Sequence, residues 1–214
     1  MSKIQKIQKP KILDKLFEIN DIHTEIILEE KLQDKMLQNN VIKNKNEHGF
    51  TIDSCIFRNV IFNSCSLPNV DLMDTIFDNC DLSNMDFRGG SIHRVEFIDC
   101  KLLGTKFDES FLKDVLFTNC LAKYSNFSFS KLKSVNFIKT NLEESIFQEV
   151  SLNKTIFHNS NIINGYFNKT SLNNMDFTDC DIAGINVETS DISGAIVSPT
   201  QALDLVRLLN ITIR

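Results

Sequence analysis

Large apolar residues recur at every fifth position along most of this chain. The series runs from Ile52 to Val197 without an insertion, and 29 of its 30 positions hold a large apolar residue; the exception is Ala122. A period of five fits neither the 3.6-residue turn of an α-helix nor the alternation of a long strand. It fits short strands separated by turns, so each five-residue unit is expected to form one side of a coil.

A second series lies two residues before each of these centre residues. Its members are mostly small, namely Cys, Val, Thr, Ser and Gly, whereas the other three positions of each unit are mostly polar. Alternate residues of a strand point to the same face, so both series are expected to point inward. Turn formers such as Asn59, Asn79 and Gly104 fall where corners are needed. The pattern predicts a parallel β-solenoid whose coils stack at about 4.8 Å.

The order of the centre residues predicts the number of sides. From Phe77 to Phe177 a Phe recurs every ten residues, and Leu or Ile fills the alternate centres apart from Ala122. A four-sided coil of 20 residues places Phe on two opposite sides, whereas a three-sided coil would mix Phe and Leu along every side. We therefore expect four sides and about seven and a half coils over residues 50–197. The Ala122 break predicts a void, a local bulge or a shifted neighbour.

These units resemble those of the pentapeptide-repeat family, which read small, Asp or Asn, Leu or Phe, and two variable residues. The match begins at Phe50-Thr51-Ile52 and continues through Val197. The resemblance implies an all-β fold, a right-handed quadrilateral parallel β-helix with a short C-terminal α-helix as its cap. It also implies a protein-binding role, since the best-known members bind type II DNA topoisomerases, especially DNA gyrase. Those members imitate bent duplex DNA, and some protect against quinolones.

Residues 1–49 are predicted to form an N-terminal cap or arm with one degenerate coil. The five-residue series extends back through Ile42 and Leu37, but the inward partners there are polar or charged, as at Asn40 and Lys35. Charged groups do not enter a dry core unpaired. The alternating charges of residues 25–46 are also compatible with a helix.

Residues 198–214 are predicted to close the other end of the solenoid. Ser198-Pro199-Thr200 is a helix start with Pro in the first turn, and Ile211-Thr212-Ile213 alternates like a short strand. Repeat arrays need terminal caps. The family resemblance implies that such a helix also forms a homodimer interface; a cap without dimerisation is the alternative. The candidate interface residues are Leu203, Leu205, Val206, Leu208, Leu209 and Ile211.

Composition and charge restrict the setting in which the chain works. The 17 Phe against 2 Tyr and no Trp indicate a dry interior. A net charge of −5 disfavours direct nucleic-acid binding. The first 13 residues carry four Lys but no apolar signal region, and no run approaches the roughly 18 apolar residues of a membrane span. We expect a cytoplasmic protein that does not bind a membrane.

The sequence contains no arrangement typical of a catalytic or metal site. All six cysteines belong to the small inward series, and none forms a CxxC or Cys/His cluster, so packing is favoured over metal or redox chemistry. The four histidines are scattered, and there is no glycine-rich phosphate loop. We therefore predict a non-enzymatic chain without catalytic residues, metal or cofactor. The cysteines are Cys55, Cys65, Cys80, Cys100, Cys120 and Cys180.

An outward aliphatic stripe is the main candidate for a partner-binding surface. It lies on the side centred on Phe57 and its successors and consists of Ile56, Ile76, Ile98, Leu116, Ile138 and Ile156. The stripe is expected either to bind a partner or to be covered by the N-terminal arm. The same side sums to a charge of −3, the most negative of the four, and its acids include Asp78, Glu96, Asp99, Asp176 and Asp179.

Two functional hypotheses follow from these features. In the first, the chain is a DNA mimic that binds DNA gyrase or topoisomerase IV and modulates quinolone sensitivity. In the second, it is an interaction scaffold that binds an unrelated protein through the aliphatic stripe.

Overall fold

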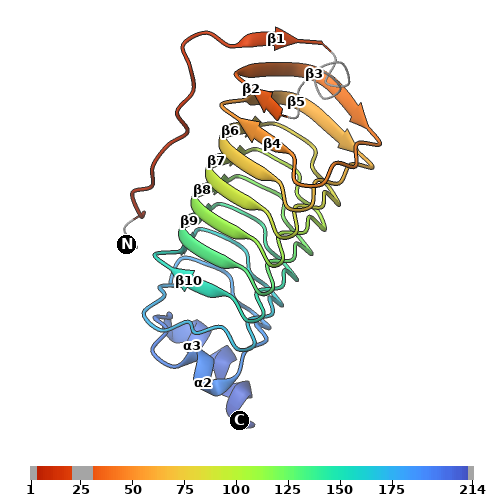
Figure 1. Ribbon diagram of the computed structural model, residues 1–214. Coiled ribbons are helices and arrows are strands. Elements are labelled where there is room, and N and C mark those ends of the chain that lie inside the picture. The colour runs from red at the N-terminus through yellow and green to blue at the C-terminus, as the bar shows by residue number, and fades with distance from the viewer. Residues whose placement is uncertain (1–3, 21–30, 212–214) are drawn as a thin grey trace.

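The chain forms one stack of parallel β-coils, which tapers into short helices at its C-terminal end (Figure 1). The computed structural model describes residues 4–20 and 31–211. Eleven strands in the described residues pair into a single parallel sheet. They are β1 (Phe17–Ile19), β2 (Lys31–Gln33), β3 (Lys35–Lys43), β4 (Thr51–Asp53), β5 (Ile56–Asn63), β6 (Asp71–Asp78), β7 (Ser91–Ile98), β8 (Phe111–Thr118), β9 (Lys131–Ile138), β10 (Ser151–Asn153) and β11 (Ile156–His158).

Each coil has 20 residues and four corners. Strand partners are displaced by 20 residues, as in Phe77 opposite Phe97 in the pairing of β6 with β7. Every fifth residue from Asp34 to Asn174, which is the second residue after each centre residue, has a positive φ. Such left-handed residues turn the chain at each corner, which is why Asn, Asp and Gly are frequent there. The predicted right-handed quadrilateral parallel β-helix is confirmed.

The four sides are numbered by their centre residues. Side 1 is centred on Phe57 and on every 20th residue after it, side 2 on Phe62, side 3 on Leu67 and side 4 on Leu72, each with the same repeat. Strands β6 to β9 each cover side 4 and side 1, with a corner residue in the middle of the strand. Sides 2 and 3 pair mostly through isolated bridges.

Two columns of phenylalanine fill the interior. On side 1, Phe117 and Phe137 stack with ring centroids 4.8 Å apart, and on side 3, Phe107 and Phe127 stack at 5.0 Å. The columns meet edge to face, as in Phe107 against Phe117 at 5.8 Å and 82°. Offset stacks and edge contacts are the favoured arrangements of aromatic pairs. The prediction that Phe occupies two opposite sides is confirmed.

The small inward residues have a structural task besides packing. The hydroxyl of Thr105 donates to the carbonyl of Leu82 at 2.9 Å, and that of Ser110 donates to the carbonyl of Phe87 at 2.9 Å. Each bond reaches the centre residue of the preceding coil, 23 positions earlier. The Cys100 thiol makes the same contact with the carbonyl of Phe77 at 3.4 Å. Small polar residues therefore enter this core because the backbone supplies an acceptor for them.

The coil remains regular at Ala122, so the bulge considered among the outcomes of this break is absent. The Ala122 amide donates to the carbonyl of Asn141 at 2.7 Å, and Tyr124 keeps the corner conformation with φ 61°. The hydroxyls of Ser125 and Ser145 both donate to the Ala122 carbonyl, at 2.7 and 2.8 Å.

The N-terminal region contains an arm and the first coils. Residues 4–16 run in an extended conformation alongside the stack, from β1 to the level of β9 (Figure 1). Strand β1 pairs with β3, and β2 pairs with β4. Residues 31–43 therefore form strands and corners, and the helix considered for residues 25–46 is wrong over this part. Lys35 and Asn40 are part-buried and remain at the margin of the core.

Short helices close the C-terminal end. They are α2 (Thr189–Ile192), α3 (Pro199–Leu205) and the 3-10 helix η1 (Val206–Leu209). The helix start predicted at Pro199 is confirmed, and Ser198 and Gln201 form a reciprocal capping box. The predicted strand at 211–213 lies mostly outside the described residues. No helix in the described part of the chain is long and apolar enough to cross a membrane.

Candidate functional site

The N-terminal arm is hydrogen-bonded to the solenoid along the corner between side 4 and side 1. The Lys11 amide donates to Asp74 Oδ1 at 2.8 Å, and the Gln8 amide donates to Asp114 Oδ1 at 3.2 Å. The side-chain amide of Asn136 donates to the carbonyl of Gln5 at 2.7 Å. All three contacts use the main chain of the arm. We call this surface, formed by Asp74, Arg94, Asp114 and Asn136, the arm track.

Outward residues of the arm track are unusually buried. Asp74 is 5% exposed, Asp114 is 7% exposed and Asn136 is 2% exposed, although all three point away from the core. Arg94 holds the Asp74 carboxylate through two hydrogen bonds of 2.6 Å. Burial alone would raise the pKa of Asp74, but hydrogen bonds from Arg94 and the Lys11 amide outweigh it and lower that pKa. The carboxylate is therefore charged and fixed in position.

The aliphatic stripe lies beside the arm track in two rows. Ile76 and Leu116 belong to the row that also contains Asn136, because Leu116 pairs directly with Asn136. Ile98 and Ile138 occupy the other row of side 1, where Ile98 pairs with Asp78 and Ile138 pairs with Thr118. Ile56 and Ile156 continue the first row. All six stripe residues are part-buried.

The predicted acids of side 1 do not gather in one place. Asp78 pairs with Arg58 at 3.0 Å, and Asp179 pairs with His158 at 2.5 Å. Asp176 accepts hydrogen bonds from the Thr178 hydroxyl and amide, which lower its pKa. Asp176 and Asp179 lie four coils, or about 19 Å, from the corresponding acids Glu96 and Asp99.

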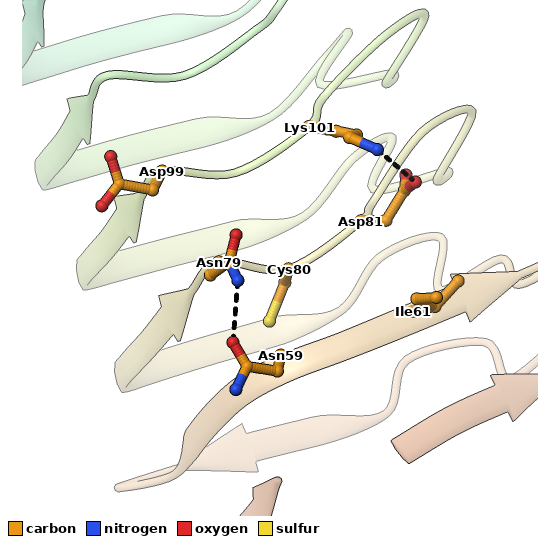
Figure 2. Close-up of a pocket in the computed structure, with 7 residues that line it drawn as sticks. All are labelled: Asn59, Ile61, Asn79, Cys80, Asp81, Asp99 and Lys101. Atoms are coloured by element: carbon orange, nitrogen blue, oxygen red, sulfur yellow. Dashed lines mark hydrogen bonds and ion pairs between the residues drawn. The ribbon is translucent and has the colours of Figure 1, made fainter. Parts of the chain in front are cut away.

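A shallow depression of about 290 Å³ lies at the corner between side 1 and side 2 (Figure 2). Asn79 donates to Asn59 at 2.8 Å, which continues an amide ladder from Asn39, and Lys101 pairs with Asp81 at 3.7 Å. Asp99 lines the same depression. The amides of Asn59 and Asn79 and the charges of Lys101 and Asp81 are already engaged along the stack, which suits a corner ladder better than a ligand pocket.

Cysteine chemistry is suppressed by the interior. Five of the six free cysteines are buried, and Cys180 is part-buried. Burial raises the pKa of Cys55 to about 12, and burial also raises that of Cys180 to about 12. A thiol, unlike a thiolate, is a poor nucleophile and metal ligand. Among the described residues, no group of His, Cys, Asp and Glu is arranged to hold a metal ion.

Four exposed apolar residues lie on sides 2 and 3 and their corners, close together along the sequence. Leu103, Leu121, Tyr124 and Phe129 are between 36% and 52% exposed and lie in two successive coils. We call these four residues the Tyr124 patch. The ammonium of Lys123 lies 5.3 Å from the centroid of the Tyr124 ring and 3.0 Å from Glu143. All four occupy outward or corner positions in the two coils around Ala122, so the sequence contains a signal for this patch, although its pattern predicts the aliphatic stripe as the binding surface.

The C-terminal candidate residues divide into two groups. Leu205 and Leu208 pack against the hydrophobic core, and Val206 is part-buried. Leu203, Leu209 and Ile211 are 59%, 60% and 56% exposed. The first group closes the solenoid, and the second leaves an apolar surface at its end.

Comparisons with known proteins give the following similarities. A family model described as a pentapeptide repeat region matches residues 70–147 and 130–198, and the SV2A/B/C luminal domain model matches residues 15–107. No curated protein matches the chain.

Similar solved structures include QnrB1, a plasmid-mediated fluoroquinolone resistance protein. The full-length form is 20% identical, with 91% of this chain and 95% of that chain covered and a TM-score of 0.48. A trypsin-treated variant is 22% identical, with 87% and 94% covered and a TM-score of 0.49. HetL, a pentapeptide repeat protein involved in heterocyst differentiation regulation in the cyanobacterium Nostoc sp. strain PCC 7120, is 14% identical, with 83% and 94% covered and a TM-score of 0.25.

The pentapeptide-repeat matches together extend from residue 70 to residue 198, which is more than half of the 214 residues. They cover coils whose 20-residue register, four corners and two Phe columns have been described above. This chain belongs to the pentapeptide-repeat family.

Proposed function

We propose that this chain is a non-enzymatic protein-binding solenoid whose partner is a type II topoisomerase, DNA gyrase or topoisomerase IV. The observation that carries the binding role is the filled, four-sided rod, which presents its polar groups along flat sides. Catalysis requires groups that converge in a pocket. The topoisomerase is the candidate partner because the sequence resembles family members that bind this class of enzyme.

The charge of the rod favours a partial imitation of DNA. Residues 50–197 contain 19 acids and 12 bases, a net charge of −7. Duplex DNA carries one charge per roughly 1.7 Å of axis, whereas seven and a half coils of about 4.8 Å give one net charge per roughly 5 Å. The solenoid therefore has about a third of the charge density of the duplex. Shape must then contribute a larger share of the affinity than charge does.

A gyrase supercoiling assay tests the topoisomerase partner. Micromolar protein is added to DNA gyrase with and without a quinolone, and the supercoiled product is measured. The proposal predicts either inhibition of supercoiling or relief of the quinolone effect. Unchanged supercoiling under both conditions, for gyrase and for topoisomerase IV, would reject this partner.

A second candidate function rests on the Tyr124 patch. Large exposed apolar residues grouped on a polar rod are typical of a protein-binding surface, and this patch would suit a scaffold for an unrelated partner. Two double variants separate the candidates in the same assay: Glu96→Gln with Asp99→Asn, and Tyr124→Ser with Phe129→Ser. A DNA mimic loses its effect with the first pair and keeps it with the second. A topoisomerase bound through the patch gives the reverse result, whereas a scaffold for an unrelated partner leaves supercoiling unchanged with the native chain and with both variants.

A further inference from the structure

The arm has a three-residue repeat of its own. Its sequence from Ile4 reads Ile-Gln-Lys-Ile-Gln-Lys-Pro-Lys. The three arm residues that contact the solenoid through their main chain are Gln5, Gln8 and Lys11, each three positions from the next. Ile7 and Pro10 are part-buried, whereas Lys6, Lys9 and Lys11 are exposed. In each three-residue unit, therefore, one part of the arm faces the solenoid and the lysine side chain is exposed to solvent.

This repeat matches the spacing of the coils. A polyproline II helix has three residues per turn and rises about 3.1 Å per residue, so one turn advances about 9.3 Å. Asp74 and Asp114 are two coils apart, which is about 9.6 Å at 4.8 Å per coil. An extended segment of this kind therefore presents an amide to the same corner of every second coil. Pro10 favours the conformation and forfeits no contact, because the Gln8 and Lys11 amides are the donors.

The arm track recognises the backbone of the arm and leaves its lysines outside. The acceptors are two buried carboxylates, and Arg94 orients one of them from the coil in between. Lys6, Lys9 and Lys11 are exposed, and side 1, which borders the arm track, contains three more acids than bases over its whole length. Main-chain contacts tolerate different side chains, while the acidic side favours a basic segment.

We propose that the arm track is a peptide-binding surface for extended, lysine-bearing segments in the polyproline II conformation, and that the arm is its resident ligand. A partner protein that uses this surface presents such a segment and displaces the arm. This inference goes beyond the proposed function, since it concerns the chemistry of the peptide on one side of the rod and holds whether or not the partner is a topoisomerase.

Displacement has to overcome the tether. A linked segment faces its site at an effective concentration of the order of millimolar, so a free peptide of similar intrinsic affinity competes poorly with it. The track must therefore be vacated in the full-length chain before it is probed.

Proline substitution vacates the track without changing the preferred backbone conformation. Gln8→Pro with Lys11→Pro removes the two N–H donors, and proline itself favours polyproline II. Gln5→Pro with Lys9→Pro is the matched control, because Gln5 contributes its carbonyl and Lys9 lies between the contacts. Trypsin cleavage after Lys6 measures arm release. We expect at least a tenfold faster cut in the first variant than in the native chain or the control; equal rates in the two variants would contradict the assigned contacts.

A labelled peptide of residues 4–13 then tests binding in trans by fluorescence anisotropy. It should bind the full-length Gln8→Pro, Lys11→Pro variant and bind the native chain at least tenfold more weakly. The same peptide with proline at both positions should not bind. Adding Asp114→Ala to the vacated variant should abolish binding, while Asp114→Asn, which keeps an acceptor oxygen, should retain it. Circular dichroism checks that both remain folded. Absence of binding to the vacated variant, or equal binding to the native chain, would overturn the proposal.

Discussion

The thiol of Cys55 shows how strongly the interior acts on a single residue. Cys55 is fully buried, and burial, assisted by nearby Asp53 and Asp34, raises its pKa to about 12. In the unfolded chain a thiol ionises near pH 8.5. Between these two pH values the unfolded chain releases a proton that the folded chain retains, so unfolding becomes more favourable as the pH rises. Below about pH 8.5 both states hold the proton and Cys55 adds no pH dependence.

Replacing Cys55 with Ser should therefore flatten the loss of stability at alkaline pH. From about pH 10 to 11 the native chain should lose roughly 1.4 kcal/mol more of its free energy of unfolding than the variant does. Urea unfolding at several pH values measures this difference, and the other titrating groups cancel because both chains contain them. Serine keeps a small hydrogen-bonding side chain. Parallel stability curves above pH 9 would show that the Cys55 thiol does not resist ionisation.

Residue-level features were predictable to the extent that they repeat. Every centre residue and every small inward residue obeys one backbone rule, so Phe77 and Cys100 could be placed in the core from their position in the series. The contacts between Gln8 and Asp114 or between Gln5 and Asn136 join residues more than 100 positions apart. No periodic signal connects such pairs. Their partners could be found only when the coils were placed in space.

At the scale of elements, the C-terminal helices contain core-packed and exposed leucines that the sequence could not separate. Apolar residues recur through α3 and η1, but only one face of these helices packs against the core. Leu205 and Leu208 contact the core, while Leu203 and Leu209 remain exposed. A pattern of hydrophobic positions in a helix does not indicate how much of that helix the end of the solenoid can cover. The exposed leucines are the residues on which a dimer would depend.

Charges at those positions should prevent dimerisation while the fold persists. We expect native protein to elute as a homodimer, and Leu203→Lys with Leu209→Lys to be monomeric, since a lysine in an apolar interface is costly. Asp204→Lys changes the charge of the same helix at an exposed position and should remain dimeric. Light scattering coupled to size exclusion measures the mass. If the native chain were monomeric, the C-terminal helices would be a cap without a dimer interface.

At the scale of the whole molecule, the arm and the solenoid follow different rules. The solenoid is built from nearest-neighbour contacts between coils, so its stability is approximately a sum over coils. The arm crosses several coils and joins the level of β6 to that of β9 through Asp74 and Asn136. The stripe prediction includes coverage of side 1 by the arm, but it does not identify the contacting residues, because the sequence provides no sign of where an irregular segment docks.

The four-sided register predicts that a short deletion can destabilise the chain more than a longer one. Removing residues 143–162 joins Leu142 to Ile163 and takes out one whole coil. Phe177 then stacks on Phe137, and the Phe columns continue. Removing only residues 143–147 moves every later residue by one side, so that Phe157 lies over Leu132 and a Leu faces the side 3 column.

The shorter deletion should therefore destabilise the chain more than the longer one does. Mismatched layers leave voids and overpacked contacts, each of which typically costs about 1–3 kcal/mol. Both deletions remove Glu143 and Ser145, so their contacts with Lys123 and Ala122 are lost equally. Thermal unfolding followed by far-ultraviolet circular dichroism gives the midpoints. The 20-residue deletion should unfold in one transition at the higher temperature. If the five-residue deletion proved equally stable, the Phe columns would not be what specifies the register of the coils.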